Sequence, residues 1–120
     1  MAGEQQSAEC IFCRIASGEL SAAIVYEDEL VVAFRDVNPQ APTHVLVIPR
    51  EHVASLNEVP EESEGIVGHI VRVAAQIAEA EGCAGPGYRL VANCGREAGQ
   101  SVDHMHFHLL GGRALGWPPG

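Results

Sequence analysis

The chain has 120 residues, of which 47% are hydrophobic, and this length and composition suit one domain with a single apolar core. Sixteen acidic residues against seven basic ones give a formal net charge of −9, which argues against binding to a nucleic acid backbone. No apolar run reaches the ~20 residues of a membrane span, and residues 1–8 lack the pattern of a signal peptide. We therefore expect a cytoplasmic protein that binds no membrane, with a flexible N-terminus at 1–8 and one domain at 9–120.

The first half of the domain predicts one short helix and three strands. Apolar residues at helical spacing favour a helix over residues 9–17, and Gly18 follows where a left-handed cap is expected. Two runs rich in β-branched and aromatic residues, at 23–26 and 30–34, are typical of a hairpin. A third, buried strand is expected at 43–48, after a loop that two prolines interrupt.

The second half predicts one long helix and two further strands. An apolar stripe begins after Pro60 and ends near Glu81, where a glycine follows as the expected cap. Strands are expected at 88–92 and 101–110, and residues 110–120 should form an extended tail. Strands, one long helix and then strands again indicate an α+β domain built on a five-stranded antiparallel sheet.

Three histidines alternate with apolar residues in the last predicted strand. His104, His106 and His108 fall on one face of a pleated strand, while Met105 and Phe107 fall on the core face. Surface histidines on the wet face of an amphipathic strand are one interpretation, but three at alternate positions make it a weak one. A row of imidazoles suits either a metal ion or a phosphate group, and spacing alone does not separate the two.

The cysteines offer a second candidate site. Without a secretory signal we expect the four cysteines to be mostly reduced, which disfavours a disulfide framework. Cys10 and Cys13 form a C-x2-C pair, a spacing that holds a metal or performs redox chemistry. Redox chemistry is the weaker interpretation because no thioredoxin-like βαβ pattern surrounds the pair.

Several separated segments resemble one protein family. Residues 104–110 are similar to the signature of the histidine triad (HIT) superfamily, in which three histidines alternate with apolar residues. The segments that resemble its nucleotide-binding branch (HINT) follow in the same order, at 41–49, 98–102, 111–113 and 117–120. The resemblance implies a HIT-like fold with one long and one short helix, and a homodimer whose sheet continues across both protomers.

The resemblance also implies an activity. Relatives of this branch hydrolyse the P–N bond of purine nucleoside 5′-phosphoramidates, such as AMP-NH2 and AMP-lysine conjugates, through a nucleotidyl-histidine intermediate. His106 matches the nucleophile of the family, His44 and His108 match histidines that orient phosphate and leaving group, and Ser101 matches a hydroxyl beside the leaving group. In transferases of the superfamily glutamine usually replaces the last histidine of the motif, so His108 favours hydrolysis.

Other positions match residues that contact the nucleotide in the family. Taken alone, Asp36 is typical of a turn and the apolar members are typical of a core, so only the resemblance assigns them to a ligand. The expected nucleotide-binding residues are Ile11, Phe12, Ile15, Phe34, Asp36, Val37, Asn93, Gly99, Gln100, Ser101, His106 and His108. Two alternatives stay open: a dinucleoside polyphosphate hydrolase of the same superfamily, or a nucleotide-binding interaction module with incidental hydrolysis.

In many bacterial-type relatives the cysteine pair belongs to a structural zinc site. The matching residues here are Cys10, Cys13, His52 and His104, a Cys2His2 set suited to a closed tetrahedral site. We therefore expect structural zinc, with no catalytic metal and no organic cofactor. A catalytic metal bound by the triad itself is the rival interpretation.

Overall fold

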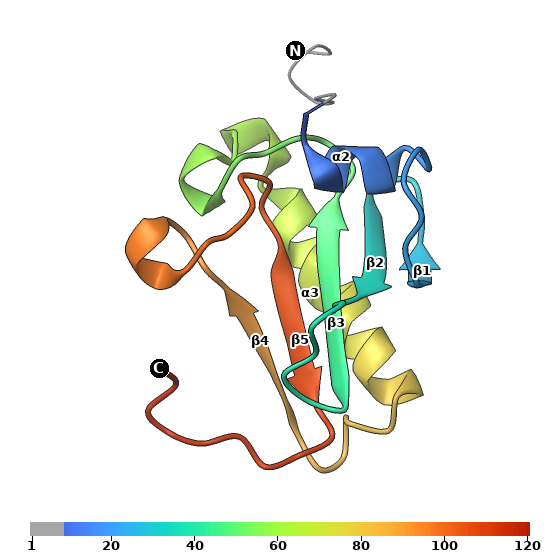
Figure 1. Ribbon diagram of the computed structural model, residues 1–120, viewed down its shortest axis with the longest axis vertical. Helices are drawn as coiled ribbons and strands as arrows, with labels where there is room; N and C mark the ends of the chain where they lie inside the picture. Colours follow the sequence, from blue (N-terminus) through green and yellow to red (C-terminus); the bar gives the residue numbers. More distant parts are fainter. Residues whose placement is uncertain (1–8) are drawn as a thin grey trace.

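Five antiparallel strands form one sheet in the computed structural model, which describes residues 9–120. Their order across the sheet is β1-β2-β3-β5-β4, so the first and fourth strands form its edges (Figure 1). The strands are Ile24–Glu27 (β1), Val31–Arg35 (β2), Thr43–Pro49 (β3), Tyr88–Ala92 (β4) and Phe107–Gly111 (β5). The expected α+β architecture is confirmed, whereas the N-terminus expected at 1–8 lies outside the described residues.

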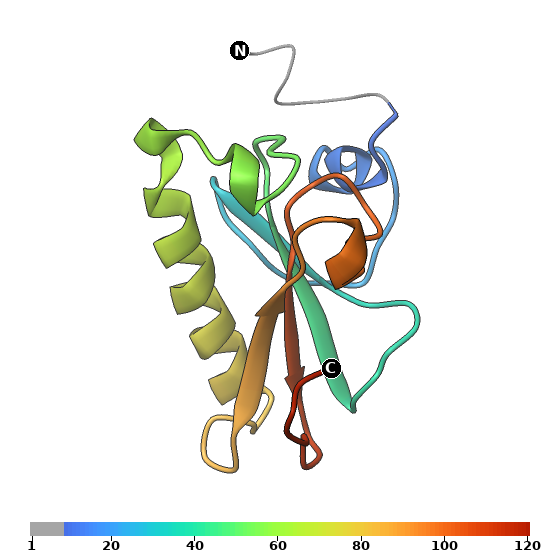
Figure 2. The same cartoon turned by 90° about the vertical axis from the view of Figure 1, so that its left-hand side faces the viewer.

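The two faces of the sheet are covered differently. The long helix α3 (Gly65–Ala80) lies along one face, and the short helix α2 (Ile11–Ala16) lies at one end of the other (Figure 2). Side chains along β3 point alternately to the two faces of the sheet: Val45 and Val47 pack in the core under α3, while Leu46 packs with α2. The part of the second face that α2 leaves uncovered is where the histidines lie.

The long helix begins later than its apolar pattern suggests. Residues 60–81 were expected to form one helix, but two short 3-10 turns, Leu56–Glu58 and Glu61–Ser63, precede α3. Ser63 donates its N–H to the Pro60 carbonyl at 2.9 Å, an i→i+3 bond that winds this segment more tightly than an α-helix. The end is as expected, since Gly82 has φ +81 and caps the helix.

The last strand is shorter than the alternating pattern predicts. It begins at Phe107 rather than at residue 101, because its neighbour β3 ends at Pro49, which has no N–H for the ladder. Met105 donates its N–H instead to the carbonyl of Val53, at 2.6 Å. The predicted alternation is nevertheless confirmed, since Met105 and Phe107 belong to the core under α3.

Two features of the remaining chain bear on the site. A 3-10 turn, Arg96–Ala98, connects β4 to the histidine segment, and residues 112–120 form no helix or strand. Among residues 9–120 no helix is long and apolar enough to cross a bilayer, and the cytoplasmic location stays a prediction.

A tight contact at the end of β5 gives a test of the packing. A Cβ added at Gly111 would lie 2.6 Å from Cys83 Sγ and 3.0 Å from Cys83 Cβ, and Cys83 is buried. We expect Gly111→Ala to lower the free energy of unfolding by about 1–3 kcal/mol through overpacking, measured by urea denaturation. Gly85→Ala is the control, because a Cβ there meets no atom within 4 Å; equal effects of the two substitutions would contradict the packing.

Candidate active site and metal centre

Three histidines meet on the face of the sheet opposite α3. His44 lies on β3 and His108 on the neighbouring β5, where Leu46 is the direct partner of His108. His106 precedes β5 by one residue, and its side chain is 4% exposed. The ring centroids of His106 and His108 are 5.1 Å apart, and those of His44 and His108 are 5.2 Å apart. The three imidazoles therefore form one group.

The protonation of His106 follows from its backbone partner. Its Nδ1 lies 2.7 Å from the carbonyl oxygen of His104, and because a carbonyl only accepts, Nδ1 must carry the proton and donate it. In the neutral ring Nε2 is then unprotonated and keeps its lone pair. Phe12 packs edge-on against the ring at a centroid distance of 5.1 Å and limits its rotation. The Nε2 lone pair of His106 is thus available for bonding to a ligand.

The protonation of the other two histidines follows in the same way. Gln40 donates its backbone N–H to His44 Nδ1 at 3.0 Å, so the proton of neutral His44 is on Nε2. That Nε2–H donates to His108 Nδ1 at 2.9 Å. The proton of neutral His108 is then on Nε2, where it is available to a ligand. The chain Gln40–His44–His108 therefore ends in a hydrogen-bond donor.

Burial keeps this donor chain neutral. Desolvation lowers the pKa of His108 from 6.5 to about 4, helped by repulsion from His106 and His44 and opposed by Asp36. Desolvation also lowers the pKa of His44, while the Asp36 carboxylate, whose Oδ2 lies 3.4 Å from His44 Nε2, raises it. At neutral pH both rings are uncharged, so their tautomers persist.

The low pKa of His108 predicts how stability depends on pH. Above pH 6.5 neither the folded nor the unfolded chain protonates His108, but between 6.5 and about 4 only the unfolded chain does. We expect this group to lower the free energy of unfolding as the pH falls through that window, by at most about 1.4 kcal/mol per pH unit. Urea titrations of wild type and His108→Gln should show the steeper decline in wild type; equal slopes would contradict the assignment.

A largely apolar cavity of about 540 Å³ opens beside His106 and His108. Ile11 is 46% exposed and Val37 is fully exposed, so both offer apolar surface at its mouth. Phe12 and Phe34 are buried and contact each other edge-on at 5.4 Å, which makes them part of the wall rather than free rings. The expected residues that line the cavity are Ile11, Phe12, Ile15, Phe34, Asp36, Val37, Ser101, His106 and His108.

The remaining expected residues have different surroundings. Asn93 lines a second cavity, which it shares with His44 and His108. Gly99 ends the 3-10 turn with φ +89. The side chain of Gln100 donates to the carbonyls of Ala54, at 2.7 Å, and Val102, at 3.0 Å, so it braces the loop before the histidines. Direct contact of Asn93, Gly99 and Gln100 with a nucleotide stays a prediction.

The sequence interpretation missed part of the cavity wall. Leu46 and residues 20–23 also line it. Leu46 was predictable, because it follows His44 by two positions on the same strand and therefore shares its face. The segment 20–23 lies between α2 and β1 and has no periodic pattern that would have indicated its position.

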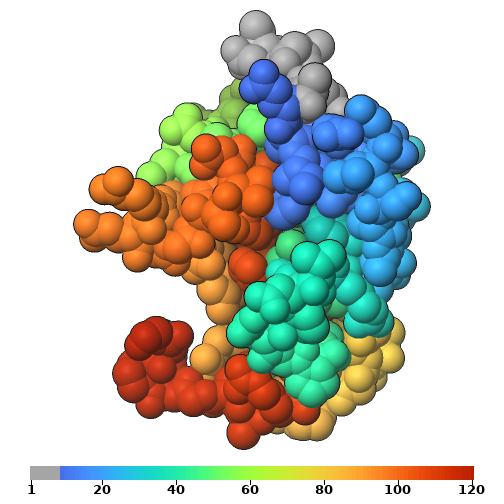
Figure 3. Space-filling view, in the orientation of Figure 1, coloured from blue at the N-terminus to red at the C-terminus, as the bar shows by residue number. Residues whose placement is uncertain are grey.

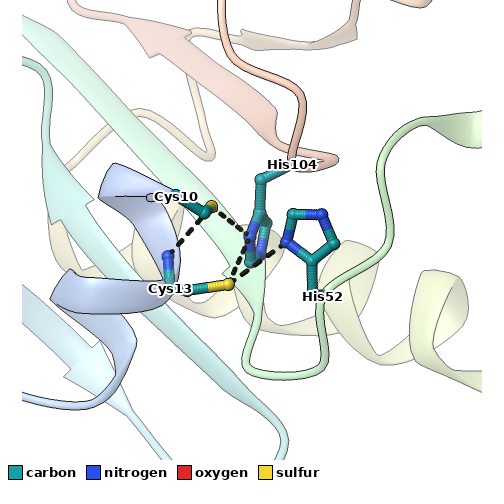
Figure 4. A group of neighbouring side chains, drawn as sticks. All are labelled: Cys10, Cys13, His52 and His104. Carbon is teal, nitrogen blue, oxygen red and sulfur yellow. Dashed lines mark hydrogen bonds between the residues drawn. The ribbon is translucent and has the colours of Figure 1, made fainter. Parts of the chain in front are cut away.

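The two cysteines and two further histidines form a compact cluster (Figure 4). Cys10 Sγ lies 3.3 Å from His104 Nδ1, and Cys13 Sγ lies 3.2 Å from His52 Nδ1 and 3.5 Å from His104 Nδ1. One ligand atom from each of the four residues lies within 4.8 Å of the others, so the cluster can hold a metal ion. It links α2, the loop after β3 and the segment before β5.

The chemistry of these four groups fits a tetrahedral metal. With ordinary zinc–sulfur and zinc–nitrogen bond lengths, a sulfur and a nitrogen ligand would be about 3.6 Å apart, close to the observed separations. His104 Nε2 donates to the Pro49 carbonyl at 2.8 Å, which directs the Nδ1 lone pair at the thiols. A histidine ligand braced through its other nitrogen is the usual arrangement at metal sites.

A second set of potential metal ligands lies in the histidine group. One ligand atom each from Asp36, His44 and His108 also lies within 4.8 Å of the others. The nitrogens concerned are joined by the hydrogen bond between His44 and His108, which a metal there would displace. This set contains only His108 of the triad, so a catalytic metal here would differ from one bound by the triad itself, and its presence can be tested.

Comparison with known proteins identifies the family. The HIT domain model matches residues 17–115, which include His44 and the three histidines of the motif. The chain belongs to the HIT domain family. The cysteine pair precedes the matched HIT segment, so Cys10 and Cys13 lie outside what the domain model describes.

Individual HIT relatives are similar over nearly the same length. The purine nucleoside phosphoramidase of Escherichia coli strain K12 is 53% identical over 108 residues, covering 90% of this chain and 91% of that protein. The crystal structure of a HIT family hydrolase from Legionella pneumophila Philadelphia 1 superposes with a TM-score of 0.91 at 49% identity, covering 93% of this chain and 100% of that one. The crystal structure of a histidine triad nucleotide-binding protein from Candida albicans superposes with a TM-score of 0.73 at 34% identity, covering 92% of this chain and 83% of that one.

Proposed function

We propose that this HIT protein hydrolyses the P–N bond of purine nucleoside 5′-phosphoramidates through a nucleotidyl-histidine intermediate. The observation that carries the proposal is the hydrogen bond from His106 Nδ1 to the His104 carbonyl, which leaves Nε2 as a nucleophile beside a cavity of nucleoside size. The name of the Escherichia coli relative supports the same activity.

The first step transfers the nucleotide to His106. The Nε2 lone pair attacks the α-phosphorus and forms a new P–N bond, while the bond to the amine breaks and its electron pair leaves with the amine nitrogen. The departing amine takes up a proton, which the hydroxyl of Ser101 relays from water. The His108 Nε2–H donates to a phosphoryl oxygen and, being neutral, does so without repelling the attacking ring.

The second step releases the nucleotide. Once Nε2 is bonded to phosphorus, His106 is a cation whose Nδ1–H still donates to the His104 carbonyl, so the bond at 2.7 Å strengthens as positive charge develops. Water then attacks the phosphorus, loses its proton to solvent, and expels the neutral imidazole with the electron pair of the broken bond. AMP and the free enzyme result.

We propose that the nucleoside occupies the cavity beside α2. The purine lies against the apolar side chains at its mouth, and the carboxylate of Asp36 accepts hydrogen bonds from the ribose hydroxyls. Asp36 Oδ1 already accepts the N–H of Asn38 at 2.8 Å, which fixes the carboxylate in the turn. Asn93, Gly99 and Gln100 are proposed to support the phosphate side of the nucleotide.

We propose that zinc occupies the cysteine cluster in a structural role. The four ligands complete a tetrahedral set, which would stabilise the fold without an open position for substrate. Bound there, the metal would fix the His104 segment, whose carbonyl orients His106. Purified protein should contain about one equivalent of zinc per chain.

We propose a homodimer in which the two sheets join along β4. This edge strand has no neighbour on its outer side among the described residues, and Tyr88 on it is 39% exposed. On α3 the exposed Val71 lies beside the small residues Gly68 and Ala75, a surface that permits close helix contact. The other edge strand, β1, is four residues long and irregular in register, which suits pairing less well.

Substitution of Val71 tests the dimer. Light scattering with size-exclusion chromatography should give twice the chain mass for wild type and a shift toward monomer for Val71→Glu, because a carboxylate would be buried in the interface. Leu30→Glu is the matched control, since Leu30 is 51% exposed in the turn between β1 and β2. A wild-type monomer at micromolar concentration would contradict the proposal.

A substrate comparison tests the activity. Adenosine 5′-phosphoramidate should be hydrolysed with a kcat/KM within the enzymatic range of about 10^4 to 10^8 M⁻¹s⁻¹, well above that for a diadenosine polyphosphate. The reverse order would make the chain a dinucleoside polyphosphate hydrolase, and tight AMP binding without turnover would make it an interaction module. Rapid chelation that abolishes activity while circular dichroism stays unchanged would assign a catalytic metal to Asp36, His44 and His108.

A further inference from the structure

The metal cluster is buried on one side and reaches the surface on the other. Cys13 and His104 are 1% and 0% exposed, whereas Cys10 and His52 are only half-buried. Both half-buried residues line a cavity of about 450 Å³, together with residues 101–103. Figure 3 shows the blue segment that contains Cys10 beside the orange segment near residue 100, and these segments bound the cavity. A small solute therefore has a route from solvent to Cys10.

The two cysteines of the cluster are placed for a disulfide bond. Their sulfurs lie within 4.8 Å of each other, and Cys13 donates its backbone N–H to Cys10 Sγ at 3.2 Å. Arg14 donates its N–H to the Cys10 carbonyl at 3.0 Å, which closes a helical turn around the pair. Cα atoms three residues apart in such a turn are about 5 Å apart, inside the range of about 4.4–6.8 Å found in disulfides. Side-chain rotation is therefore enough to join the sulfurs.

A disulfide at this site and a bound zinc ion exclude each other, because the metal needs both sulfurs as thiolates. Thiolates are also the form that peroxides oxidise. The first product is a sulfenic acid, which a second thiolate nearby converts to a disulfide. Cys10 lines the cavity and Cys13 is its buried neighbour, so the pair has both the accessible sulfur and the second sulfur that this reaction needs.

The metal cluster is connected to the nucleoside cavity by two contacts of His106. Ile11 and Phe12 lie between the two cysteines in the chain, and both line the cavity beside His106. Phe12 packs edge-on against the His106 ring at a centroid distance of 5.1 Å. The metal ligand His104 supplies the carbonyl that accepts the proton of His106 Nδ1. A change at the cluster therefore acts on both the cavity wall and the orientation of His106.

We propose that Cys10 and Cys13 are an oxidation site, where a peroxide forms a disulfide, expels the zinc ion and weakens nucleotide binding. The Cys10 thiolate attacks hydrogen peroxide and becomes a sulfenic acid as the O–O bond breaks. The Cys13 thiolate then attacks that sulfur and displaces its oxygen. Two thiolates lose two electrons, and the peroxide takes up these electrons and two protons to give two water molecules. The inference rests on the proposed zinc and, for its effect on nucleotides, on the proposed nucleotide site.

Titration of the zinc-loaded protein with hydrogen peroxide tests the oxidation without an assay of activity. We expect about one zinc ion per chain to be released to a chromophoric chelator. Peptide mass spectrometry after alkylation should find a disulfide between Cys10 and Cys13, and dithiothreitol with added zinc should restore the thiols and the metal. Zinc that is retained at peroxide concentrations that oxidise Cys94 would overturn the proposal, and so would zinc loss with both thiols intact.

Cys94→Ser is the matched control for this titration. Cys94 is partly exposed and lies outside the cluster, so its removal takes away a reactive thiol without changing a metal ligand. The variant should release zinc at the same peroxide concentration as wild type and form the same disulfide. Zinc release that requires Cys94 would assign the sensitive thiol to that residue and overturn the proposal.

AMP binding measured by calorimetry tests the connection to the nucleoside cavity. The oxidised, zinc-free protein should bind AMP about tenfold more weakly than the reduced, zinc-loaded protein. Because linkage is reciprocal, saturating AMP should shift the midpoint of disulfide formation in a glutathione buffer toward more oxidising conditions. Equal AMP affinities of the two forms would overturn the connection. Failure of the reduced form to bind AMP would instead contradict the proposed nucleotide site, which the zinc-release measurement does not involve.

Discussion

Replacing His106 with alanine should lower kcat/KM for adenosine 5′-phosphoramidate by about 10^4-fold or more. Neither neighbouring imidazole offers a free lone pair in its place, because His108 Nδ1 accepts from the Nε2–H of His44 and His44 Nδ1 accepts from the N–H of Gln40. Loss of a nucleophile that divides one displacement into two steps commonly costs this much in hydrolases. AMP release followed by chromatography measures the effect.

His69→Ala is the matched control for this substitution. His69 lies on α3 and bonds Asp28 at 2.7 Å, on a part of the molecule that neither cavity includes. It should keep near wild-type turnover, and thermal unfolding should show that the His106 variant stays folded. Hydrolysis by the His106 variant at the wild-type rate would show that a different group, or activated water, attacks the phosphorus.

Removing the buried cysteine of the metal cluster should produce the second large effect. Cys13 is 1% exposed and approaches both histidine ligands, so Cys13→Ser should reduce metal content and lower the free energy of unfolding. We expect a loss on the order of 3–5 kcal/mol, less than the full binding energy of a structural zinc because the sheet and α3 provide their own core. Metal analysis and urea denaturation measure the two consequences.

A second cysteine provides the control for the metal site. Cys94 lies outside the cluster and is partly exposed, so Cys94→Ser should keep both metal content and stability. A double variant, Cys10→Ser with Cys13→Ser, that still binds one equivalent of metal would disprove this assignment. Reduced activity is also expected in Cys13→Ser, because the His104 segment that orients His106 would be released.

Local patterns in the sequence were sufficient to predict most of the fold. Apolar periodicity predicted α3 and all five strands, and β4 has the bounds expected from its composition. The predicted start of β5, at residue 101, was wrong by six residues. The alternation of side chains continues into an extended segment before Phe107 that has no strand partner. The pairing of β5 with β3 stops at Pro49, which has no N–H for the ladder. Pro49 is 55 residues away from His104 in the sequence, so a local pattern does not indicate this limit.

The grouping of the histidines and of the cysteines was predictable, but the protonation of the histidines was not. Alternation grouped the three histidines, and the family resemblance added His44 and the cysteine pair. Which ring nitrogen carries the proton depends on carbonyl and amide groups of the folded backbone, at His104, Gln40 and Pro49. The second cavity was not predicted, because its walls come from β4, the loop around Gln40 and the C-terminal segment, which are far apart in the sequence.

Trapping the intermediate is the most direct test of the central claim, that His106 Nε2 attacks the phosphorus. The enzyme should be mixed with adenosine 5′-phosphoramidate, quenched within milliseconds, digested, and analysed by mass spectrometry under conditions that preserve phosphohistidine. We expect one adenylyl group on the peptide that contains His106, located on that residue by fragmentation and absent from the His106→Ala variant. An adduct on His44, His108 or Ser101, or turnover without any adduct and with inversion at phosphorus, would contradict it.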